Sequence, residues 1–519
     1  MTGLLNKFHP CLGSGIISFG MILFLYGCAK SQPPKESTKI SIKYDINAEN
    51  QTIRNFSASD AWACQFVGNW PEAKKNAIAD WLFSMDTLTN GNPKGIGLSM
   101  WRYNIGAGTA AQADGSGIKD EWRRAASINN NDANSVKLIE GQNWFLKAAK
   151  NRGVNQFLGF FNSPPVNLTA NGKGYASNGQ CNITEDKYAS FAQYAISAIN
   201  QTKTNTGINF DFISPVNEPQ WDWSDGGQEG SPYTNDQIRG VVKAFNTEFE
   251  KSTIASKILL TEAGQLNYLL EANDKPEKDN QISDFFDPVS PNYVGNLTSV
   301  SKTIASHSYF TTSPMVKGIE LRNKVKQRVN QVQQLEFWQS EYCILGDNAG
   351  EINGNIRDLG MDAALYVAKV IYQDMVAANA SAWQWWLAVS PYNYKDGLVY
   401  VDKNNNDGNY YDSKMLWAMG NYSRFIRPGS RRIDVGQVSD PALLVSGYKN
   451  VNSDAVILVV INSSGDSKSL DLSGNALVGD NNIVTFTTDN TYNLAKNKVS
   501  AKDIVLPARS IVTLVIGKN

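Results

Sequence analysis

The sequence predicts an α/β protein: a (β/α)8 TIM barrel with a side antiparallel β-sandwich domain. Two observations support this prediction. Between residues 56 and 429, eight short apolar runs alternate with amphipathic stretches, which is typical of repeated β-α units. After residue 429 the helical periodicity is lost. Apolar runs are then separated by turns rich in Gly, Asn and Asp, which is typical of an antiparallel sandwich.

Eight apolar runs are predicted as the barrel strands. They are Phe56–Trp62, Ile96–Ile105, Asn155–Phe161, Phe210–Val216, Lys257–Thr261, Thr303–Tyr309, Leu335–Ser340 and Ala382–Leu387. Helices are predicted between them, over Glu72–Ser84, Gly141–Asn151, Glu185–Asn200, Asp236–Lys251, Glu320–Gln333 and Asp362–Ala378. A doubly wound parallel sheet is the competing architecture, but no Gly-rich phosphate-binding fingerprint follows an early strand.

A smaller domain is predicted over residues 430–519. Its apolar runs are Ala455–Ile461, Ile483–Phe486 and Ser510–Ile516, and the first is too continuous to face water on both sides. The early run Thr38–Asp45 is predicted to bring residues 39–55 into the same sandwich. We therefore expect a sandwich that is discontinuous in sequence and packed against the barrel.

Residues 1–28 are predicted to be an export signal. The apolar stretch Leu12–Tyr26 is too short to span a bilayer comfortably. It leads into Tyr26-Gly27-Cys28, which resembles a bacterial lipoprotein box, although the Tyr is bulkier than that pattern favours. We expect lipidation of Cys28 and anchoring to a bacterial (outer) membrane, on its periplasmic or cell-surface side, with residues 29–38 as a tether. A plain signal peptide or an uncleaved anchor is the alternative.

Charge and composition narrow the class of protein. The chain carries 48 Lys and Arg against 49 Asp and Glu, a formal net charge of -1, which argues against a nucleic-acid partner. Hydrophobic residues make up 42% and charged residues 19%, so most of the chain can bury a core. The 13 Trp, 21 Tyr and 21 Phe suit either a large core or ligands that present C–H faces and hydroxyls.

The sequence indicates neither disulfide nor metal chemistry. Beyond the leader lie Cys64, Cys181 and Cys343, an odd number without CxxC spacing, which favours neither a disulfide framework nor a zinc site. His307 is the one histidine outside the leader, so the sequence has no histidine pair for a catalytic metal. We therefore expect no cofactor.

Two glutamates end predicted barrel strands, where the active residues of such barrels lie. The strand Phe210–Val216 runs into Asn217 and Glu218, and the strand Leu335–Ser340 runs into Glu341. Sugar hydrolysis needs two carboxylates, one to protonate the leaving oxygen and one to stabilise or attack the anomeric carbon. Asn217 is placed to hydrogen-bond a sugar hydroxyl. The pattern therefore predicts chemistry on glycosidic bonds.

Six motifs in order resemble glycoside hydrolase family 30, within the clan of retaining (β/α)8 enzymes. They are Phe56–Trp62, Arg102–Gly108, Asn162–Pro165, Asn217–Pro219, His307–Tyr309 and Leu416–Gly429, and the resemblance runs from about Lys39 to the C-terminus. That family pairs its barrel with a side β-sandwich built from the N-terminal strand and the C-terminal region. The resemblance therefore implies the same architecture as the hydrophobic pattern.

The resemblance also implies roles for individual residues. Glu218 would be the acid/base and Glu341 the nucleophile of a double displacement. His307 and Tyr309 would flank Glu341. One of Trp383, Trp385 and Trp386 would form the floor of the sugar pocket, and the alignment with the family favours Trp386. The residues that would surround the sugar at the cleavage point are Asp60, Trp62, Arg102, Asn104 and Asn217.

The loop after Glu218 bears on the substrate. Trp221 and Trp223 in this loop are expected to stack on sugars beyond the cleavage point, which suits action inside a chain. Within the family, the loop resembles most the members that cleave β-1,6-linked galactan. β-1,6-Glucanases, xylanases and exo-acting β-glycosidases share the core and remain alternatives. Departures from the family pattern at Asn55–Ala58 and Pro165 leave the sugar preference open.

Two further interpretations use the same residues. A carbohydrate-binding lipoprotein without turnover would typically have lost one carboxylate, yet Glu218 and Glu341 are both present. A transglycosylase would use the same covalent intermediate, with a sugar hydroxyl in place of water. Nearby Glu262 and Asp222 are interpreted as loop or supporting residues. We expect a polysaccharide or oligosaccharide substrate, no nucleic acid, and a monomer that meets the membrane through its lipid anchor only.

Overall fold

The computed structural model describes residues 39–517, apart from residues 273, 347–348, 451–452, 454 and 479–482. The described residues belong to one compact unit that starts at Lys39. The predicted leader 1–28, with Cys28, and the tether 29–38 lie outside the described residues. Within the described part, no helix combines the length and the apolar character that crossing a bilayer requires.

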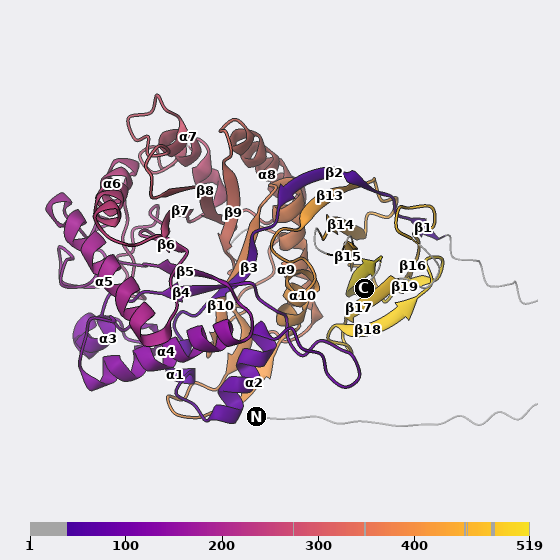
Figure 1. Ribbon diagram of the computed structural model, residues 1–519, viewed down its shortest axis with the longest axis horizontal. Helices are drawn as coiled ribbons and strands as arrows, with labels where there is room; N and C mark the ends of the chain where they lie inside the picture. The colour runs from indigo at the N-terminus through magenta and orange to yellow at the C-terminus, as the bar shows by residue number, and fades with distance from the viewer. Residues whose placement is uncertain are drawn as a thin grey trace, which may run out of the picture. The chain divides into compact units, whose positions relative to one another are not determined.

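Eight parallel strands form a closed barrel (Figure 1). They are β3 (Asn55–Ser59), β4 (Met100–Asn104), β5 (Gln156–Phe160), β6 (Phe212–Ser214), β7 (Lys257–Ala263), β8 (Val300–His307), β9 (Glu336–Glu341) and β10 (Ala382–Ser390). Neighbours along the chain pair from β3 to β9, and β10 closes the ring because it pairs with both β9 and β3. The predicted (β/α)8 barrel is confirmed.

Helices follow the barrel strands in the chain (Figure 1). The α-helices are α1 (Cys64–Val67), α2 (Glu72–Phe83), α3 (Thr109–Gln112), α4 (Ala133–Asn151), α5 (Tyr188–Thr206), α6 (Asn235–Lys251), α7 (Gln281–Phe286), α8 (Met315–Asn330), α9 (Met361–Tyr372) and α10 (Lys414–Ser423). Short 3-10 helices are η1 (Ala113–Ser116), η2 (Glu121–Arg123), η3 (Glu185–Lys187) and η4 (Leu266–Leu269), and the π-helical turn η5 (Gln373–Ala377) continues α9.

Local sequence signals explain where these helices begin. Thr234 and Gln237 form a reciprocal capping box at the start of α6. Helix α4 begins at Ala133, earlier than the predicted Gly141, because the Asp132 side chain accepts the Ser135 N–H and caps it there. Three elements at the end of the barrel are not predicted by the sequence: α10, β11 (Gly397–Val401), which pairs in parallel with β10, and β12 (Tyr410–Asp412), which pairs with β11.

The second domain consists of two sheets. Their strand orders are β18-β17-β20-β15-β14-β13-β2 and β1-β16-β19. The strands are β1 (Ile40–Ser41), β2 (Tyr44–Thr52), β13 (Arg431–Val435), β14 (Leu443–Lys449), β15 (Val456–Asn462), β16 (Lys468–Asp471), β17 (Ile483–Thr488), β18 (Ala495–Val499), β19 (Ile504–Leu506) and β20 (Ser510–Ile516). The large sheet is antiparallel, whereas β1 pairs with β16 in parallel. The N-terminal segment contributes one strand to each sheet.

Strand β15 is buried on both faces and joins the two domains. Leu458 and Val460 pack in the sandwich's own hydrophobic cluster. Ile457 and Ile461, which point to the other face, belong to the cluster that fills the barrel. Helix α9 contacts β14, β15 and β20, and α10 contacts β17 and β20. The sandwich therefore packs directly on the last helices of the barrel.

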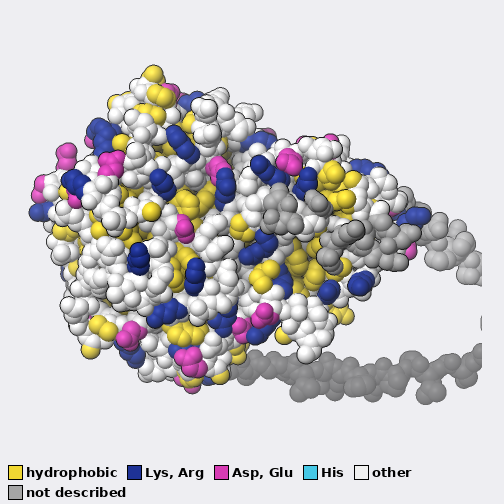
Figure 2. Space-filling view, in the orientation of Figure 1, with side chains coloured by type: hydrophobic (Ala, Val, Ile, Leu, Met, Phe, Trp, Pro, Cys, Tyr) yellow, Lys and Arg dark blue, Asp and Glu magenta, His cyan; other side chains and the backbone are white. Residues whose placement is uncertain are grey.

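The charged surface is mixed on the face that Figure 2 views. Lys and Arg side chains stand separately there, with Asp and Glu side chains among them and hydrophobic areas between. This distribution agrees with the net charge of -1.

Candidate functional site

A cavity of about 400 Å³ lies at the carboxyl ends of the barrel strands. Its lining includes both predicted catalytic glutamates, Glu218 and Glu341. The other lining residues are Trp62, Arg123, Asn217, Trp221, Trp223, Gln228, Tyr309, Phe310, Cys343, Ile344, Leu345, Asn355, Trp386, Tyr394 and Asp396. They come from several barrel strands and from the connections that follow them, as expected for a site at this end of the fold.

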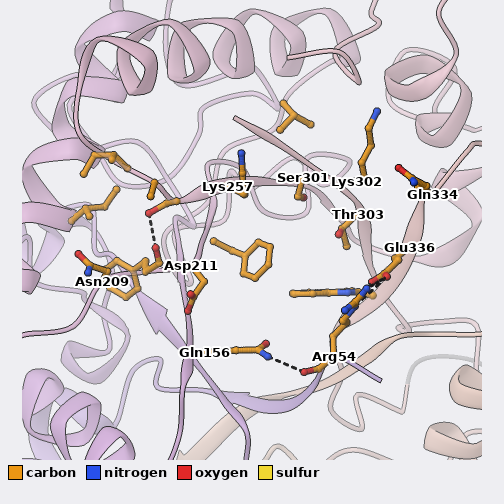
Figure 3. A pocket seen from close by; sticks show the side chains of 18 of the residues that line it. Arg54, Gln156, Asn209, Asp211, Lys257, Ser301, Lys302, Thr303, Gln334 and Glu336 are labelled. Atoms are coloured by element: carbon orange, nitrogen blue, oxygen red, sulfur yellow. Dashed lines mark hydrogen bonds and ion pairs between the residues drawn. The ribbon is translucent and has the colours of Figure 1, made fainter. Parts of the chain in front are cut away.

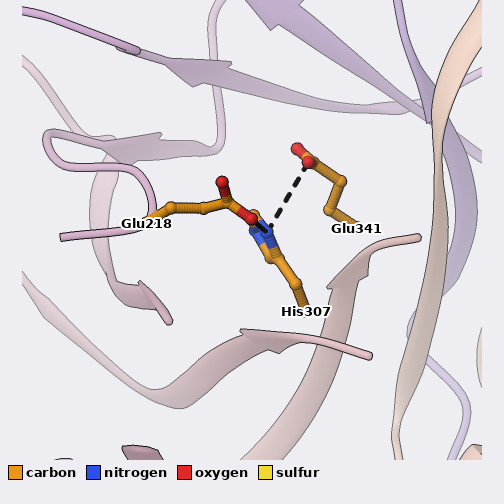
Figure 4. A group of neighbouring side chains, drawn as sticks. All are labelled: Glu218, His307 and Glu341. Carbon is orange, nitrogen blue, oxygen red and sulfur yellow. Dashed lines mark hydrogen bonds and ion pairs between the residues drawn. The ribbon is translucent and has the colours of Figure 1, made fainter. Parts of the chain in front are cut away.

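Glu218 and Glu341 approach each other from two strands. Glu341 is the last residue of β9, and Glu218 follows β6 with a positive φ of 44°. The Glu218 backbone N–H donates to the carbonyl of Glu262 at 2.8 Å, which holds this left-handed residue in place. One carboxyl oxygen of each glutamate and one ring nitrogen of His307 all lie within 4.8 Å of one another (Figure 4).

Two donors hold the carboxylate of Glu341. Arg102 Nη1 donates to Glu341 Oε2 at 2.5 Å, and the Tyr309 hydroxyl donates to Oε1 at 3.0 Å. Arg102 lies in β4, where its Nη2 also donates to Asn217 Oδ1 at 3.1 Å and its guanidinium covers the Phe160 ring at 3.8 Å. These two contacts orient the Glu341 carboxyl group in the cavity.

Glu218 is in a different environment. It is 7% exposed, and its Oε1 lies 2.8 Å from His307 Nδ1 (Figure 4). Burial raises the pKa of Glu218, the hydrogen bond and charge of His307 lower it, and the negative charge of Glu341 raises it again. The balance leaves the pKa of Glu218 above its usual value. This carboxyl group is therefore suited to hold a proton when Glu341 has none.

Glu262 joins the same cluster from β7. Its Oε2 lies 3.2 Å from His307 Nε2 and 3.6 Å from Arg102 Nη2. Burial raises the pKa of Glu262, but Arg102 and His307 lower it to about 2. The signal that identifies Glu262 in the sequence is the same as for the two catalytic candidates, a Glu near the end of a barrel strand. Like Glu218, it has a positive φ, here 53°.

The ring of His307 is fully buried between acids. Burial lowers its pKa, but Glu341, Glu218 and Glu262 together raise it to about 10. Two carboxylates and an imidazole also form a donor set that divalent cations can use. In this cluster Arg102 contacts Glu341, and His307 lies between Glu218 and Glu262.

Aromatic side chains form the walls of the cavity. Trp62 and Trp386 pack edge to face with ring centroids 5.3 Å apart, and the buried Trp62 Nε1 has no hydrogen-bond partner among the described residues. On the loop after Glu218, Trp221 packs edge to face on Phe310 at 5.7 Å. Trp223 Nε1 donates to the Glu218 carbonyl at 3.0 Å, so that indole also fixes the turn.

Asp60 and Asn104 are buried and are not among the residues that line the cavity. Asp60 Oδ1 accepts the Asn104 backbone N–H at 2.7 Å, and Oδ2 accepts from Gln142 Nε2 at 3.1 Å. Burial raises the pKa of Asp60 to about 8, although these hydrogen bonds by themselves lower it. Asn104 Oδ1 is buried and has no partner among the described residues. The pair ties the ends of β3 and β4 together.

Two charged lining residues are not singled out by the sequence. Arg123 comes from η2 and lies over the rings of Trp62, at 5.2 Å, and Tyr392, at 5.1 Å. Asp396 lies between β10 and β11, and burial raises its pKa to about 6. Its Oδ1 is buried without a partner among the described residues. Neither position follows a predicted strand, so the sequence pattern carries no signal for them.

A larger hollow of about 1420 Å³ lies at the opposite end of the barrel (Figure 3). Its lining includes Gln156, Lys257 and Glu336, which begin β5, β7 and β9. There Arg54 pairs with Glu336, and Gln156 Nε2 donates to the Arg54 carbonyl at 3.1 Å. In this fold the amino ends of the strands serve stability, and the chemistry belongs to the other end.

Known proteins match this chain over most of its length. The sequence profile of O-glycosyl hydrolase family 30 matches residues 39–400. The glucuronoxylanase XynC of Bacillus subtilis is 24% identical over 489 residues, which cover 92% of this chain and 91% of that protein.

Solved structures show the same architecture. A conserved exported protein from Bacteroides fragilis is 31% identical, with a TM-score of 0.84, over 92% of this chain and 100% of that one. The catalytic domain of a GH30 xylanase C from Talaromyces cellulolyticus is 21% identical, with a TM-score of 0.64, over 92% and 100% of the two chains. An endo-β1,6-glucanase is 16% identical, with a TM-score of 0.61, over 94% of this chain and 96% of that one.

Proposed function

Because the chain belongs to O-glycosyl hydrolase family 30, and is thus an O-glycosyl hydrolase, we propose that it is a retaining enzyme that cleaves β-glycosidic bonds within a polysaccharide. The observation that supports this most is the pair of buried carboxyl groups, Glu218 and Glu341, with oxygens within 4.8 Å. Retaining enzymes place their carboxyl groups about 5–5.5 Å apart, whereas inverting enzymes leave about 6.5–9.5 Å for a water molecule.

In the first half-reaction, Glu341 is the nucleophile. Arg102 and Tyr309 each donate a hydrogen bond to its carboxylate and orient it. One carboxylate oxygen forms a bond to the anomeric carbon while the bond from that carbon to the leaving oxygen breaks. Glu218, whose pKa is raised, donates its proton to the leaving oxygen.

In the second half-reaction, Glu218 acts as the base. Esterification removes the charge of Glu341, and with it one of the influences that raise the pKa of Glu218. Glu218 then takes a proton from water, whose oxygen attacks the anomeric carbon and releases Glu341. Two displacements at the same carbon return the original anomeric configuration.

The sugar at the cleavage point is bound by polar atoms beside the two glutamates and by the aromatic walls. Asn217 lines the cavity next to Glu218 and is held by Arg102. The unpartnered Nε1–H of Trp62 is a donor available to a sugar hydroxyl, and Trp386 offers a ring face beside it. Asp60 and Asn104 support this wall from behind.

The substrate we propose is a β-1,6-linked galactan, cleaved inside the chain. The support is the loop 220–230, whose Trp221 and Trp223 line the cavity next to the acid/base and can contact sugars on the leaving-group side. A glucuronoxylanase is similar in sequence, and a GH30 xylanase and an endo-β1,6-glucanase are similar in fold. Xylan and β-1,6-glucan are therefore the competing substrates in the test.

A panel of defined polysaccharides with sizing of the products tests the substrate. Oligosaccharides of mixed length released early from β-1,6-galactan, and not from xylan or β-1,6-glucan, are the expected result. Preference for either other polymer would overturn the galactan assignment. Products longer than the substrate would indicate transglycosylation, and binding without products would indicate a carbohydrate-binding protein.

Paired variants test the roles of the glutamates. Glu341→Ala should lose at least about 10³-fold in kcat with every substrate. Glu218→Ala should still release an activated aryl leaving group, which needs no proton, and azide should accelerate its second step. Glu336→Gln is the matched control, because Glu336 begins the strand that Glu341 ends. Full activity in Glu341→Ala would refute the mechanism.

A further inference from the structure

Glu262 is a buried carboxylate that the double displacement does not use. Both of its oxygens accept hydroxyl hydrogen bonds, Oε1 from Ser214 at 2.6 Å and Oε2 from Ser340 at 2.5 Å. Oε2 also lies 3.2 Å from His307 Nε2 and 3.6 Å from Arg102 Nη2. A carboxylate held by two hydroxyl donors beside two cationic groups is a fixed anion.

His307 connects this anion to the acid/base. Its Nε2 faces Glu262, while its Nδ1 lies 2.8 Å from Glu218 Oε1 and 3.6 Å from Glu341 Oε1. The charged and titratable groups that face the ring from the surrounding strands are Arg102 in β4, Glu218 after β6, Glu262 in β7, Tyr309 after β8 and Glu341 in β9. The ring itself is fully buried.

We propose that Glu262 is a positioning residue, whose negative charge keeps His307 an imidazolium that donates from Nε2 to Glu262 and from Nδ1 to Glu218 Oε1. The proposal rests on the proposed roles of Glu218 and Glu341. With Oε1 occupied as an acceptor, the catalytic proton of Glu218 resides on Oε2, from which it goes to the leaving oxygen. The raised pKa of His307 and the lowered pKa of Glu262 point in the same direction.

Charge balance explains why a second fixed anion is needed. In the free enzyme the anions Glu341 and Glu262 balance the cations Arg102 and His307, and Glu218 is neutral. In the covalent intermediate Glu341 is an uncharged ester, and the negative charge has moved to Glu218. The buried cluster is thus electrically neutral in both half-reactions. Without Glu262 it would carry a net positive charge, which a water-poor site disfavours.

A neutral His307 would work against catalysis. Its Nδ1 would be an acceptor, because Nε2–H donates to Glu262. Glu218 would then donate its proton to that nitrogen at 2.8 Å and not to the leaving group. The charge of Glu262 therefore decides which way the hydrogen bond between His307 and Glu218 points.

Nitrogen NMR of the imidazole tests the charge of His307 directly, without activity. The sequence has two histidines, so in a His9→Gln background without a histidine tag His307 gives the one imidazole signal. An ordinary histidine, with a pKa of about 6.5, is neutral at pH 8. We expect both ring nitrogens of His307 to be protonated at pH 8. A single protonated nitrogen at that pH would overturn the proposal.

The pH dependence of Glu262→Gln tests the coupling to Glu218. Gln keeps the shape and can still accept from His307, but it removes the charge. Every proton in the cluster should then be lost at lower pH. The alkaline limb of kcat/KM should move down by about one pH unit or more, together with the imidazole titration. An unchanged alkaline limb would overturn the proposal. A structural defect alone would lower kcat/KM without moving this limb, so the shift of the limb is specific to the lost charge.

Controls separate this proposal from the proposed function. Asp211→Asn removes an exposed carboxylate at the other end of β6, where its Oδ2 accepts the Phe157 N–H at 2.8 Å, and should leave the limb in place. The loss in kcat/KM caused by Glu262→Gln should be smaller on an activated aryl glycoside, whose leaving group needs no proton, than on an oligosaccharide. Failure of the wild type to cleave any β-glycoside would refute the proposed function, while the NMR result would still decide the charge of His307.

Discussion

Tyr309 and Arg102 hold the two oxygens of Glu341 separately: the Tyr309 hydroxyl donates to Oε1 at 3.0 Å, and the guanidinium donates to Oε2. Hydrogen bonds to a charged group contribute about 1.5–3 kcal/mol. Tyr309→Phe should therefore lower kcat/KM roughly 10- to 160-fold, because the nucleophile loses one of its two donors. Initial rates on an aryl glycoside measure this. Tyr44→Phe, which removes a hydroxyl bonded to Ala476 in the sandwich, is the control and should be silent. Equal loss in both variants would contradict a specific role.

Part of this site is readable in the sequence, and the reason is topological. Glu218, His307 and Glu341 end or follow barrel strands, and strand ends in a (β/α)8 fold converge on one face. Arg123 and Asp396 reach the same cavity from η2 and from the connection before β11, which have no periodic pattern to place them. Contacts of this kind depend on tertiary packing of loops.

The resemblance also implies that Asp60 lies beside the sugar. The hydrophobic pattern predicts the position of this residue but not the direction of its carboxylate. A residue after β3 is expected at the carboxyl face, and Asp60 does lie there. Whether its carboxylate points to the cavity depends on competing partners, and Asn104 N–H and Gln142 Nε2 bind it from behind. Gln142 lies on α4, whose rotation about its axis is not visible in the hydrophobic pattern.

The galactan assignment predicts a substrate-dependent effect of Trp221. Trp221→Ala should lower kcat/KM on the polysaccharide at least about tenfold, because the ring face that contacts sugars on the leaving-group side is lost. A small aryl glycoside places only its aryl group on that side and should lose less of its kcat/KM than the polysaccharide does. Trp221 is the informative choice, because Trp223 also holds the Glu218 carbonyl. Equal loss on both substrates would contradict the assignment.

The predicted lipid anchor depends on Cys28. Cys28→Ser should release the protein from the membrane fraction or block its maturation, because the thiol that carries the lipid is gone. Fractionation of cells and mass spectrometry of the mature N-terminus measure this. Activity of the released protein should be unchanged. Two results together would refute the anchor: the variant fractionates as the wild type does, and the wild type carries no lipid.

The contact between barrel and sandwich predicts a stability effect at Asn421. Its Nδ2 donates to Thr513 Oγ1 at 2.9 Å and to the Phe486 carbonyl at 3.0 Å, and the Thr513 hydroxyl donates back to the Asn421 carbonyl at 2.7 Å. Asn421→Ala should lower the free energy of unfolding by about 1–3 kcal/mol, because buried partners lose their hydrogen bonds. Denaturant unfolding measures this, with the exposed Asn497→Ala as control. Equal stability of the two variants would show that this contact is dispensable.

The stereochemistry of the first product tests the double displacement most directly. Proton NMR during early hydrolysis of a β-linked oligosaccharide identifies the anomer before mutarotation mixes the two forms. Attack by Glu341 followed by attack of water predicts that the β-anomer appears first. First appearance of the α-anomer would mean a single displacement by water, and would contradict the assignment of Glu341 as the nucleophile.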